Sequence, residues 1–170
     1  IVNSRQHERL TGLLDDATVV TGGRSAGQAM EPTIVLDPSP DSPVMTGEIF
    51  GPILPVMSVG SLDEAITYIN KGDKPLAAYI FSNDKAEQQR LFTEVPAGGA
   101  VANHIAMHVL APQLPFGGVG ASGMGAYHGR WGYEAFSHRK ATLVMRARPD
   151  LKMIYPPYRE RDKKLLRKLA

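Results

Sequence analysis

The order of hydrophobic and polar residues along this chain predicts short helices and strands. Between residues 5 and 14 the apolar side chains occur only at Leu10, Leu13 and Leu14, which predicts a modestly amphipathic helix. The β-branched run at residues 17–20 ends at a Gly-Gly pair, which is typical of a strand that stops in a turn. A second strand is predicted at residues 32–36.

The middle of the chain carries the clearest pattern. Residues 53–59 are almost continuously apolar but contain Pro55, which predicts a strand at an edge or bulge of its sheet because proline has no N–H to donate. Residues 61–64 spell Ser-Leu-Asp-Glu, a capping box that predicts the start of a helix, and Gly72 predicts its end. Residues 76–81 then predict a further strand.

A second helix and another strand follow. Asn83 or Asp84 is expected to cap the helix, which runs to about Thr93 with Leu91 and Phe92 facing inward. A Gly-Gly-Ala-Val-Ala run then predicts a strand that opens into a loop. Because strands and helices alternate along this stretch, the pattern predicts a parallel α/β sheet.

Other stretches have the composition of connections. Residues 24–31 are small and polar and are expected to form a loop, and residues 37–43 hold three prolines and two aspartates. Residues 111–127 are too rich in Gly and Pro for a regular element. After them, residues 129–136 predict a short helix and residues 141–145 a final strand.

The amino-acid composition excludes several classes of protein for this chain. The 170 residues are 43% hydrophobic and 21% charged, as in ordinary globular proteins, and the net charge of +2 argues against nucleic-acid binding. There is no Cys, which excludes a disulfide scaffold and a thiol nucleophile supplied by this chain. No apolar run is long enough to predict a membrane span, and the absence of Met or a leader at Ile1 suggests a piece of a longer protein.

Charge also divides the chain. Residues 1–145 hold 10 basic and 14 acidic side chains, whereas residues 146–170 hold 9 basic and 3 acidic ones. We therefore expect a domain at residues 1–145 and a basic arm or tail at residues 146–170. The arm is interpreted as a solvated segment that can take part in oligomerisation, and a juxtamembrane anchor would require apolar sequence after Ala170.

Three motifs suggest chemistry but have simpler explanations. Residues 118–123 spell G-x-G-x-x-G, but no strand precedes them and no helix follows, so we interpret them as an irregular loop whose glycines allow close backbone approach. His104 and His108 have the spacing of zinc ligands but lack the following Glu and a third ligand, which favours solvated or hydrogen-bonded imidazoles and no metal site. Ser122 lies outside a G-x-S-x-G elbow, and a Ser-His-Asp set stays open because its partners meet only in space.

The sequence Glu48-Ile49-Phe50-Gly51-Pro52 places a carboxylate, an aromatic ring and a turn ahead of an apolar strand. Two interpretations remain open. Glu48 is either an ordinary solvent-exposed carboxylate, or it accepts hydrogen bonds from vicinal hydroxyls such as those of a ribose, with Phe50 as an apolar wall.

This pentapeptide is similar to the E-x-F-G-P signature of NAD(P)-dependent aldehyde dehydrogenases. The sequence Leu-Pro-Phe-Gly-Gly-Val-Gly that begins at Leu114, with its continuation to Gly129, resembles the loop of the class 3-like branch, which includes fatty-, aromatic- and coniferyl-aldehyde enzymes. Shorter similar segments occur in family order at residues 1–3, 31–33, 73–77, 136–138, 148–152 and 155–158.

The resemblance implies an α/β fold: a partial parallel-sheet catalytic domain with a C-terminal strand arm. Residues 1–145 would be the later half of that domain. The family's nucleophilic Cys and general-base Glu would both lie upstream of Ile1, so no catalytic residue is expected in this chain. Glu48 would hold the nicotinamide ribose and Phe50 would flank the nicotinamide, while Phe116 and His128 would form part of the substrate-side wall.

The function implied is oxidation of an aldehyde to a carboxylic acid with NAD or NADP, in a cytoplasmic homodimer without nucleic-acid partners or a membrane segment. The resemblance gives Asn103 no role. The alternative is a non-catalytic remnant that serves as an oligomerising or binding module. In either case we expect apolar strand surface to be left for a second copy or for the missing N-terminal half to cover.

Overall fold

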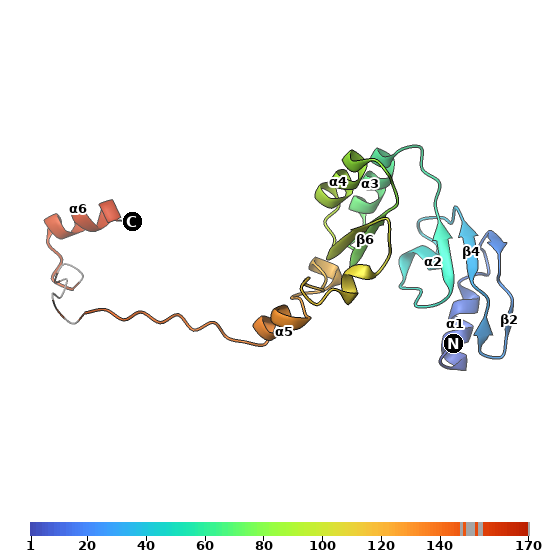
Figure 1. Cartoon of the computed structure of the whole chain (residues 1–170), viewed down its shortest axis with the longest axis horizontal. Helices are drawn as coiled ribbons and strands as arrows, with labels where there is room; N and C mark the ends of the chain where they lie inside the picture. Colours follow the sequence, from blue (N-terminus) through green and yellow to red (C-terminus); the bar gives the residue numbers. More distant parts are fainter. Residues whose placement is uncertain (147, 149–151, 153–154, 170) are drawn as a thin grey trace. The chain divides into compact units, whose positions relative to one another are not determined.

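The computed structural model describes residues 1–146, 148, 152 and 155–169 (Figure 1). The chain divides into two compact units, Ile1–Ala135 and Phe136–Ala170, and each is described by itself. Pro149, Asp150 and Leu151 of the expected arm lie outside the described residues.

The N-terminal part of the first unit contains one three-stranded sheet, a small hairpin and two helices. Its elements are α1 (Ser4–Gly12), β1 (Val19–Thr21), β2 (Ser25–Ala26), β3 (Ala29–Met30), β4 (Thr33–Leu36), α2 (Pro43–Thr46) and β5 (Ile53–Val56). The strand order is β1-β4-β5, with β1 antiparallel and β5 parallel to the central β4. Pro55 therefore lies on an edge strand, opposite Val35, as its missing N–H predicts.

The expectation of a plain loop at residues 24–31 is wrong, because β2 and β3 pair there as an antiparallel hairpin. Gly27 occupies the turn with a φ of +59°, a left-handed conformation that glycine adopts without strain. Each strand is only two residues long, which is too short for an alternating pattern to reveal it.

The core of this part forms where α1 packs with the three-stranded sheet. Leu10, Val35, Val44 and Ile53 are buried together, and Leu13 and Leu14 pack against them half-buried. The three leucines that predicted an amphipathic helix are thus the ones that contact the core.

The second part of the first unit begins after β5. Its elements are α3 (Leu62–Lys71), β6 (Ala77–Ile80), α4 (Lys85–Glu94), β7 (Gly99–Ala102), η1 (Met107–Leu110), η2 (Gly120–Ser122) and α5 (Gly129–Ala135). The strands β6 and β7 are parallel, and Ile66, Ala78, Ile80, Leu91 and Val95 form the core beside them.

Both predicted helix caps are present. The Ser61 hydroxyl accepts a hydrogen bond from the Glu64 amide (3.2 Å), and the Asp84 carboxylate accepts one from the Ala86 amide (2.7 Å). The reciprocal bond of the capping box differs from the expected form, because the Glu64 carboxylate accepts from the Gly60 amide (2.7 Å) instead of the Ser61 amide.

Two expectations for this part need correction. The α/β class with parallel strands is confirmed, but in the described residues β5 and β6 do not pair, so residues 53–101 contribute to two sheets instead of one. Each parallel pair buries its own core. Phe92 is exposed although it lies four residues after the buried Gln88, so the inward position predicted for it is wrong, whereas Leu91 is buried as predicted.

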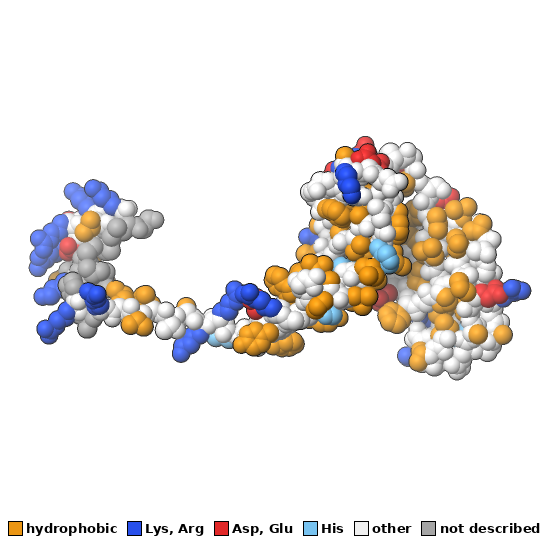
Figure 2. Space-filling view, in the orientation of Figure 1, with side chains coloured by type: hydrophobic (Ala, Val, Ile, Leu, Met, Phe, Trp, Pro, Cys, Tyr) orange, Lys and Arg blue, Asp and Glu red, His pale blue; other side chains and the backbone are white. Residues whose placement is uncertain are grey.

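Apolar strand surface is left uncovered, as expected. Leu54 is 58% exposed, and Val56, Tyr79 and Phe81 are also among the exposed large hydrophobic residues. Figure 2 shows hydrophobic side chains over much of the visible face of the first unit.

In the second unit the strand expected at residues 141–145 is absent, and these residues are exposed and irregular. An extended segment without a neighbouring strand has no partner for its backbone groups. The helix α6 (Glu160–Leu169) was not expected; it has acidic residues in its first turn and basic ones in its last, an arrangement that suits the helix dipole. No helix among the described residues is long and apolar enough to cross a membrane.

Candidate functional site

The segment at residues 48–52, called the Glu48 segment below, is irregular and presents its side chains to solvent. Glu48 is exposed, and among the described residues no hydrogen bond or ion pair engages its carboxylate. Phe50 is 86% exposed and has a φ of +44°, a conformation that a non-glycine residue rarely adopts. The carboxylate and the ring are therefore both available to a ligand.

The helix α1 supports this segment through Arg9. One terminal nitrogen, Nη2, donates to the Ile49 carbonyl at 2.6 Å, and the other, Nη1, donates to the Glu48 carbonyl at 3.3 Å. The Arg9 Nε donates to the side-chain oxygen of Gln6 at 2.8 Å, so the guanidinium is held from three directions. Sequence reasoning missed Arg9, because nothing local in a helix marks a partner 40 residues away.

Two further contacts surround the segment. A Cβ on Gly51 would lie 2.5 Å from Leu10 Cδ2, so only glycine fits against this fully buried leucine without displacement. On the other side, the Phe50 ring borders an open hollow of about 510 Å³ lined also by Ile1, Val2, Asn3 and Gln6. The start of the chain and the Glu48 segment thus share one concave surface.

The second site-bearing stretch is residues 114–129, called the glycine loop below. Phe116 and Tyr127 exchange two backbone hydrogen bonds and close it as an antiparallel bridge. A Cβ on Gly117 would lie 2.1 Å from the Gly125 carbonyl oxygen, and one on Gly118 would lie 2.0 Å from that of Ser122. This confirms the interpretation of residues 118–123 as a loop whose glycines allow close backbone approach.

Phe116 and His128 are brought together by this loop. Their ring centroids lie 6.0 Å apart, and Tyr127 stacks on His128 at 4.3 Å with its ring 5.4 Å from Phe116. Both predicted wall residues are half-buried, and His128 has a φ of +82°. The ring cluster joins the two ends of the glycine loop.

His104 and His108, which have the spacing of zinc ligands, belong to no group of three metal-ligating side chains among the described residues. His104 is exposed, and its Nδ1 contacts only the adjacent Ile105 backbone. His108 is buried between the rings of Tyr79 and Phe116, and neither of its nitrogens has a hydrogen-bond partner. The expectation of a solvated or hydrogen-bonded imidazole is therefore wrong for His108, and no group of three metal-ligating side chains occurs in the described residues.

Ser122 and Asn103 have local structural contacts. The Ser122 hydroxyl accepts from the Val119 amide at 2.9 Å and donates to the Val119 carbonyl at 3.1 Å, which leaves it without a His partner in the described chain. The Asn103 side chain accepts from the Ser82 amide at 2.9 Å and donates to the Ser82 carbonyl at 3.0 Å. Asn103 therefore ties the end of β7 to the end of β6.

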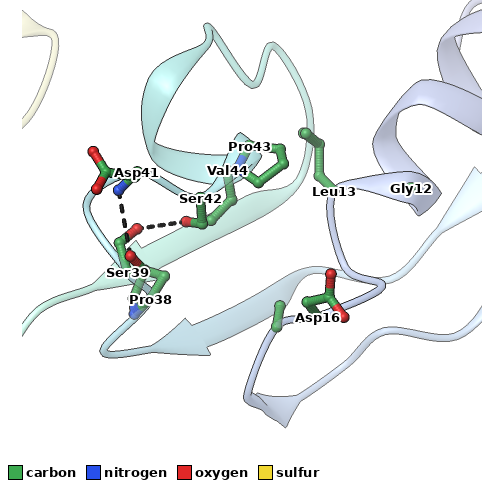
Figure 3. Close-up of a pocket in the computed structure, with 10 residues that line it drawn as sticks. Gly12, Leu13, Asp16, Pro38, Ser39, Asp41, Ser42, Pro43 and Val44 are labelled. Carbon is green, nitrogen blue, oxygen red and sulfur yellow. Dashed lines mark hydrogen bonds between the residues drawn. The ribbon is translucent and has the colours of Figure 1, made fainter.

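A further hollow of about 290 Å³ lies beside the C-terminal end of α1 (Figure 3). Leu13, Pro43 and Val44 provide an apolar wall, and Ser39 accepts the bonds that order the loop, from the Asp41 amide to its hydroxyl and from the Ser42 hydroxyl to its carbonyl. None of the predicted site residues lines it.

Among the described residues, the resolved pKa shifts occur at Arg–carboxylate ion pairs and at none of the predicted site residues. In each pair a hydrogen-bonded Arg–Glu contact raises the pKa of the arginine, as at Arg24 and Arg130, or lowers the pKa of the carboxyl, as at Glu31 and Glu94. These shifts identify surface pairs and mark no acid–base site.

Comparison with known proteins gives a consistent result. Residues 1–142 match the aldehyde dehydrogenase family. The chain is 50% identical over 164 residues to an aldehyde dehydrogenase of Craterostigma plantagineum, covering 93% of this chain and 34% of that protein. It is 48% identical over 146 residues to the dimeric NADP-preferring aldehyde dehydrogenase of Rattus norvegicus, covering 85% of this chain and 32% of the relative.

A solved structure agrees with the sequence matches. The substrate-bound state of Staphylococcus aureus AldH superposes with a TM-score of 0.87 and 42% identity, covering all of this chain and 38% of that one. The chain spans about a third of the length of these relatives. On the family match, the identity to these relatives and the shared fold, the chain belongs to the aldehyde dehydrogenase family.

Proposed function

We propose that this chain forms the C-terminal part of an enzyme that oxidises an aldehyde to a carboxylic acid with NAD+ or NADP+. The observation that carries the proposal is the family match over residues 1–142, which includes both loops. The rival interpretation, a non-catalytic binding module, is not favoured, because the matching relatives are named as dehydrogenases.

Glu48 and Phe50 would make the contacts to the nicotinamide end of the cofactor. The exposed Glu48 carboxylate is free to accept hydrogen bonds from the two hydroxyls of a ribose, and charge-assisted bonds of this kind are the stronger ones. The Phe50 ring offers an apolar face beside it. The bound nicotinamide would supply hydride acceptance, which requires reacting atoms held about 3–3.5 Å apart.

Phe116 and His128 would form part of the wall on the substrate side. Their rings pack together with Tyr127, and the backbone bridge between Phe116 and Tyr127 fixes both ends of the loop. A half-buried aromatic wall excludes water and contacts apolar parts of an aldehyde. The particular aldehyde depends on residues outside this chain.

The nucleophile would come from outside these 170 residues. The chain contains no Cys, so it has no thiol with which to attack a carbonyl. We therefore expect no aldehyde oxidation from the 170-residue chain alone with NAD+ or NADP+. Turnover above that of a heat-inactivated sample would contradict this assignment.

We also propose a cytoplasmic homodimer. The rat relative is named dimeric and NADP-preferring, whereas a similar Mycobacterium tuberculosis structure is described as complexed with NAD+. The exposed apolar residues of β5 and β6, Leu54 and Tyr79 among them, provide surface that a second copy or the rest of the subunit would cover. Sedimentation of the 170-residue chain tests this, since a stable monomer at micromolar concentration would argue against it.

The cofactor role of Glu48 is best tested in a full-length hybrid, with this chain joined to the N-terminal two thirds of the Staphylococcus aureus relative. We expect Glu48→Gln to lower turnover about ten- to a hundredfold, because a hydrogen bond to a charged group contributes roughly 1.5–3 kcal/mol. The melting temperature should stay within a degree or two, since the carboxylate has no partner in the described fold. Glu8→Gln, an exposed glutamate on α1, is the matched control.

Steady-state kinetics with NAD+ and NADP+ distinguish the outcomes. A Glu48→Gln hybrid with normal kinetics would remove Glu48 from the cofactor site. A sharply lower melting temperature with unchanged cofactor KM would make Glu48 a structural residue instead.

A further inference from the structure

The backbone of the Glu48 segment depends on Arg9 to an unusual degree. The carbonyls of Glu48 and Ile49 accept hydrogen bonds from the Arg9 guanidinium, at 3.3 and 2.6 Å. Within the described chain, no other residue forms a hydrogen bond with the backbone of residues 48–50. The segment belongs to no sheet or helix and therefore lacks the backbone hydrogen bonds of a regular element. The two hydrogen bonds from Arg9 hold its backbone instead.

Arg9 is itself well placed to act as a fixed support. It lies in α1, whose N-terminus is capped by Asn3 accepting from the Gln6 amide at 2.9 Å, and whose next residue, Leu10, is fully buried. The Gln6 side chain accepts from Arg9 Nε at 2.8 Å, which restricts rotation of the guanidinium. A planar guanidinium with several donors can satisfy three acceptors at once, which a lysine ammonium on a flexible stem does less well.

Arg9 donates to backbone carbonyls of the Glu48 segment and leaves the Glu48 carboxylate free. Arg9 engages the Glu48 backbone carbonyl, and the structure contains no ion pair between the two side chains. The same contact precedes Phe50, whose φ of +44° is a conformation that persists only where neighbouring structure holds it. One residue outside the motif thus fixes the backbone that directly follows the exposed carboxylate.

We propose that Arg9 is a positioning residue that holds the Glu48 segment in the geometry needed for the nicotinamide ribose. The inference rests on the proposed cofactor role of Glu48 and extends it to a residue 39 positions earlier. Arg9 acts through the backbone of the segment and makes no contact of its own with the cofactor.

The proposal that Arg9 holds the backbone of the Glu48 segment can be tested on the 170-residue chain by ¹⁵N relaxation. We expect Arg9→Met to lower the order parameters of residues 48–51 from rigid values of about 0.85 towards 0.6, while the rest of α1 keeps its values. Arg9→Lys should fall between the two. Arg5→Met, an exposed arginine on the same helix, is the control and should leave the segment unchanged. Unchanged order parameters in Arg9→Met would overturn the inference regardless of enzyme kinetics.

The proposal that Arg9 affects cofactor use through Glu48 is tested in the full-length hybrid with a double-mutant cycle. We expect Arg9→Met to lower turnover about tenfold, the same quantity that Glu48→Gln lowers, and to leave the aldehyde KM within twofold. Because Arg9 acts through Glu48, the Arg9→Met/Glu48→Gln double variant should be little worse than Glu48→Gln alone. Fully additive losses would overturn the inference and assign Arg9 a separate structural role.

The two proposals fail in different ways. If Glu48→Gln leaves the kinetics normal, the cofactor role of Glu48 fails and the dependent inference fails with it. If Glu48→Gln impairs the hybrid but Arg9→Met does not, the cofactor role stands and only the role of Arg9 is overturned.

Discussion

The Glu48 segment and the glycine loop carry the two pairs of predicted site residues, and they are held by opposite means. The Glu48 segment is fixed from outside by one long side chain, Arg9, which reaches two carbonyls. The glycine loop is fixed from within, by backbone approaches that exclude any Cβ at Gly117 and Gly118. The difference implies that the first loop is vulnerable to a change at Arg9, far from its motif, whereas the second is most vulnerable to a methyl group on its own glycines.

The largest effect is expected from a methyl group inside the glycine loop. In Gly118→Ala the new Cβ would lie 2.0 Å from the Ser122 carbonyl oxygen, and neither backbone can yield easily. We expect a loss of about 3 kcal/mol in the free energy of unfolding, at the upper end of overpacking costs. Urea denaturation monitored by circular dichroism measures it.

Gly132→Ala is the control for that experiment. Gly132 lies in α5, where a Cβ would make only ordinary contacts, at 3.7 Å or more, and alanine favours a helix by about 0.5–1 kcal/mol. If the two alanine variants have equal stability, close backbone approach does not fix the glycine loop.

A smaller effect is expected at the corresponding glycine of the Glu48 segment. In Gly51→Ala the Cβ would lie 2.5 Å from Leu10 Cδ2, but this atom ends a side chain that can rotate. Because Leu10 is fully buried, we expect a cost of about 1–2 kcal/mol in the free energy of unfolding. Thermal denaturation measures it, and Leu10→Val should recover part of the loss in the double variant. Strict additivity of the two changes would contradict direct contact.

Loss of the Ser122 hydroxyl should lower the free energy of unfolding by less than either glycine substitution. Ser122→Ala removes two hydrogen bonds to Val119 on an exposed part of the loop. We expect a loss of about 1 kcal/mol, the usual net value of such bonds, in thermal denaturation. Ser4→Ala, an exposed serine at the start of α1, is the control. A loss as large as that of Gly118→Ala would show that the hydroxyl, and not the glycines, fixes the loop.

The smallest effect on stability is expected at the ion pairs of Arg90, which lie outside both loops. Arg90 donates to both Glu94 oxygens (2.7 and 3.0 Å) and to Asp63 (2.6 Å), and this pairing lowers the pKa of Glu94. A lowered folded pKa stabilises the fold above the unfolded value near 4.3, and this stabilisation disappears as the pH falls through the folded pKa.

Melting temperatures of the native chain and of Glu94→Gln should therefore differ slightly at pH 7 and converge as the pH falls below the unfolded value and through the lowered folded pKa. Added salt should reduce the difference at pH 7, because the pair is exposed. A difference that grows as the pH falls would reverse the sign and contradict the pairing.

Local signals in the sequence predicted the local structure well. The sequence predicts Ser61 and either Asn83 or Asp84 as helix caps, because a cap acts on amides two or three residues away, and the structure has Ser61 and Asp84 in these positions. Pro55 predicts an edge or a bulge, because its missing N–H is a property of one residue, and the structure has it on an edge strand. The glycine pattern of residues 118–123 predicts close backbone approach, which Gly118 makes, but it does not predict that the partner is the Ser122 carbonyl.

Features that depend on distant partners were missed. The contact of Arg9 with the Glu48 segment joins residues 39 and 40 positions apart and has no local signature. The strand expected at residues 141–145 had the right composition but has no neighbouring strand in the described chain. The position of His108 between Tyr79 and Phe116 likewise follows from tertiary packing, which an i, i+4 spacing does not report.

The clamp between Asn103 and Ser82 has a consequence for the order of folding. It closes β6, α4 and β7 over a span of 21 residues, whereas the contact between Arg9 and Ile49 closes a span of 40. Closing the longer loop costs about 0.6 kcal/mol more chain entropy, since the cost grows as 1.5RT times the logarithm of loop length. Chain entropy therefore slightly favours closure of the strand–helix–strand unit, and the geometry of the Glu48 segment depends on the packing of α1 against it.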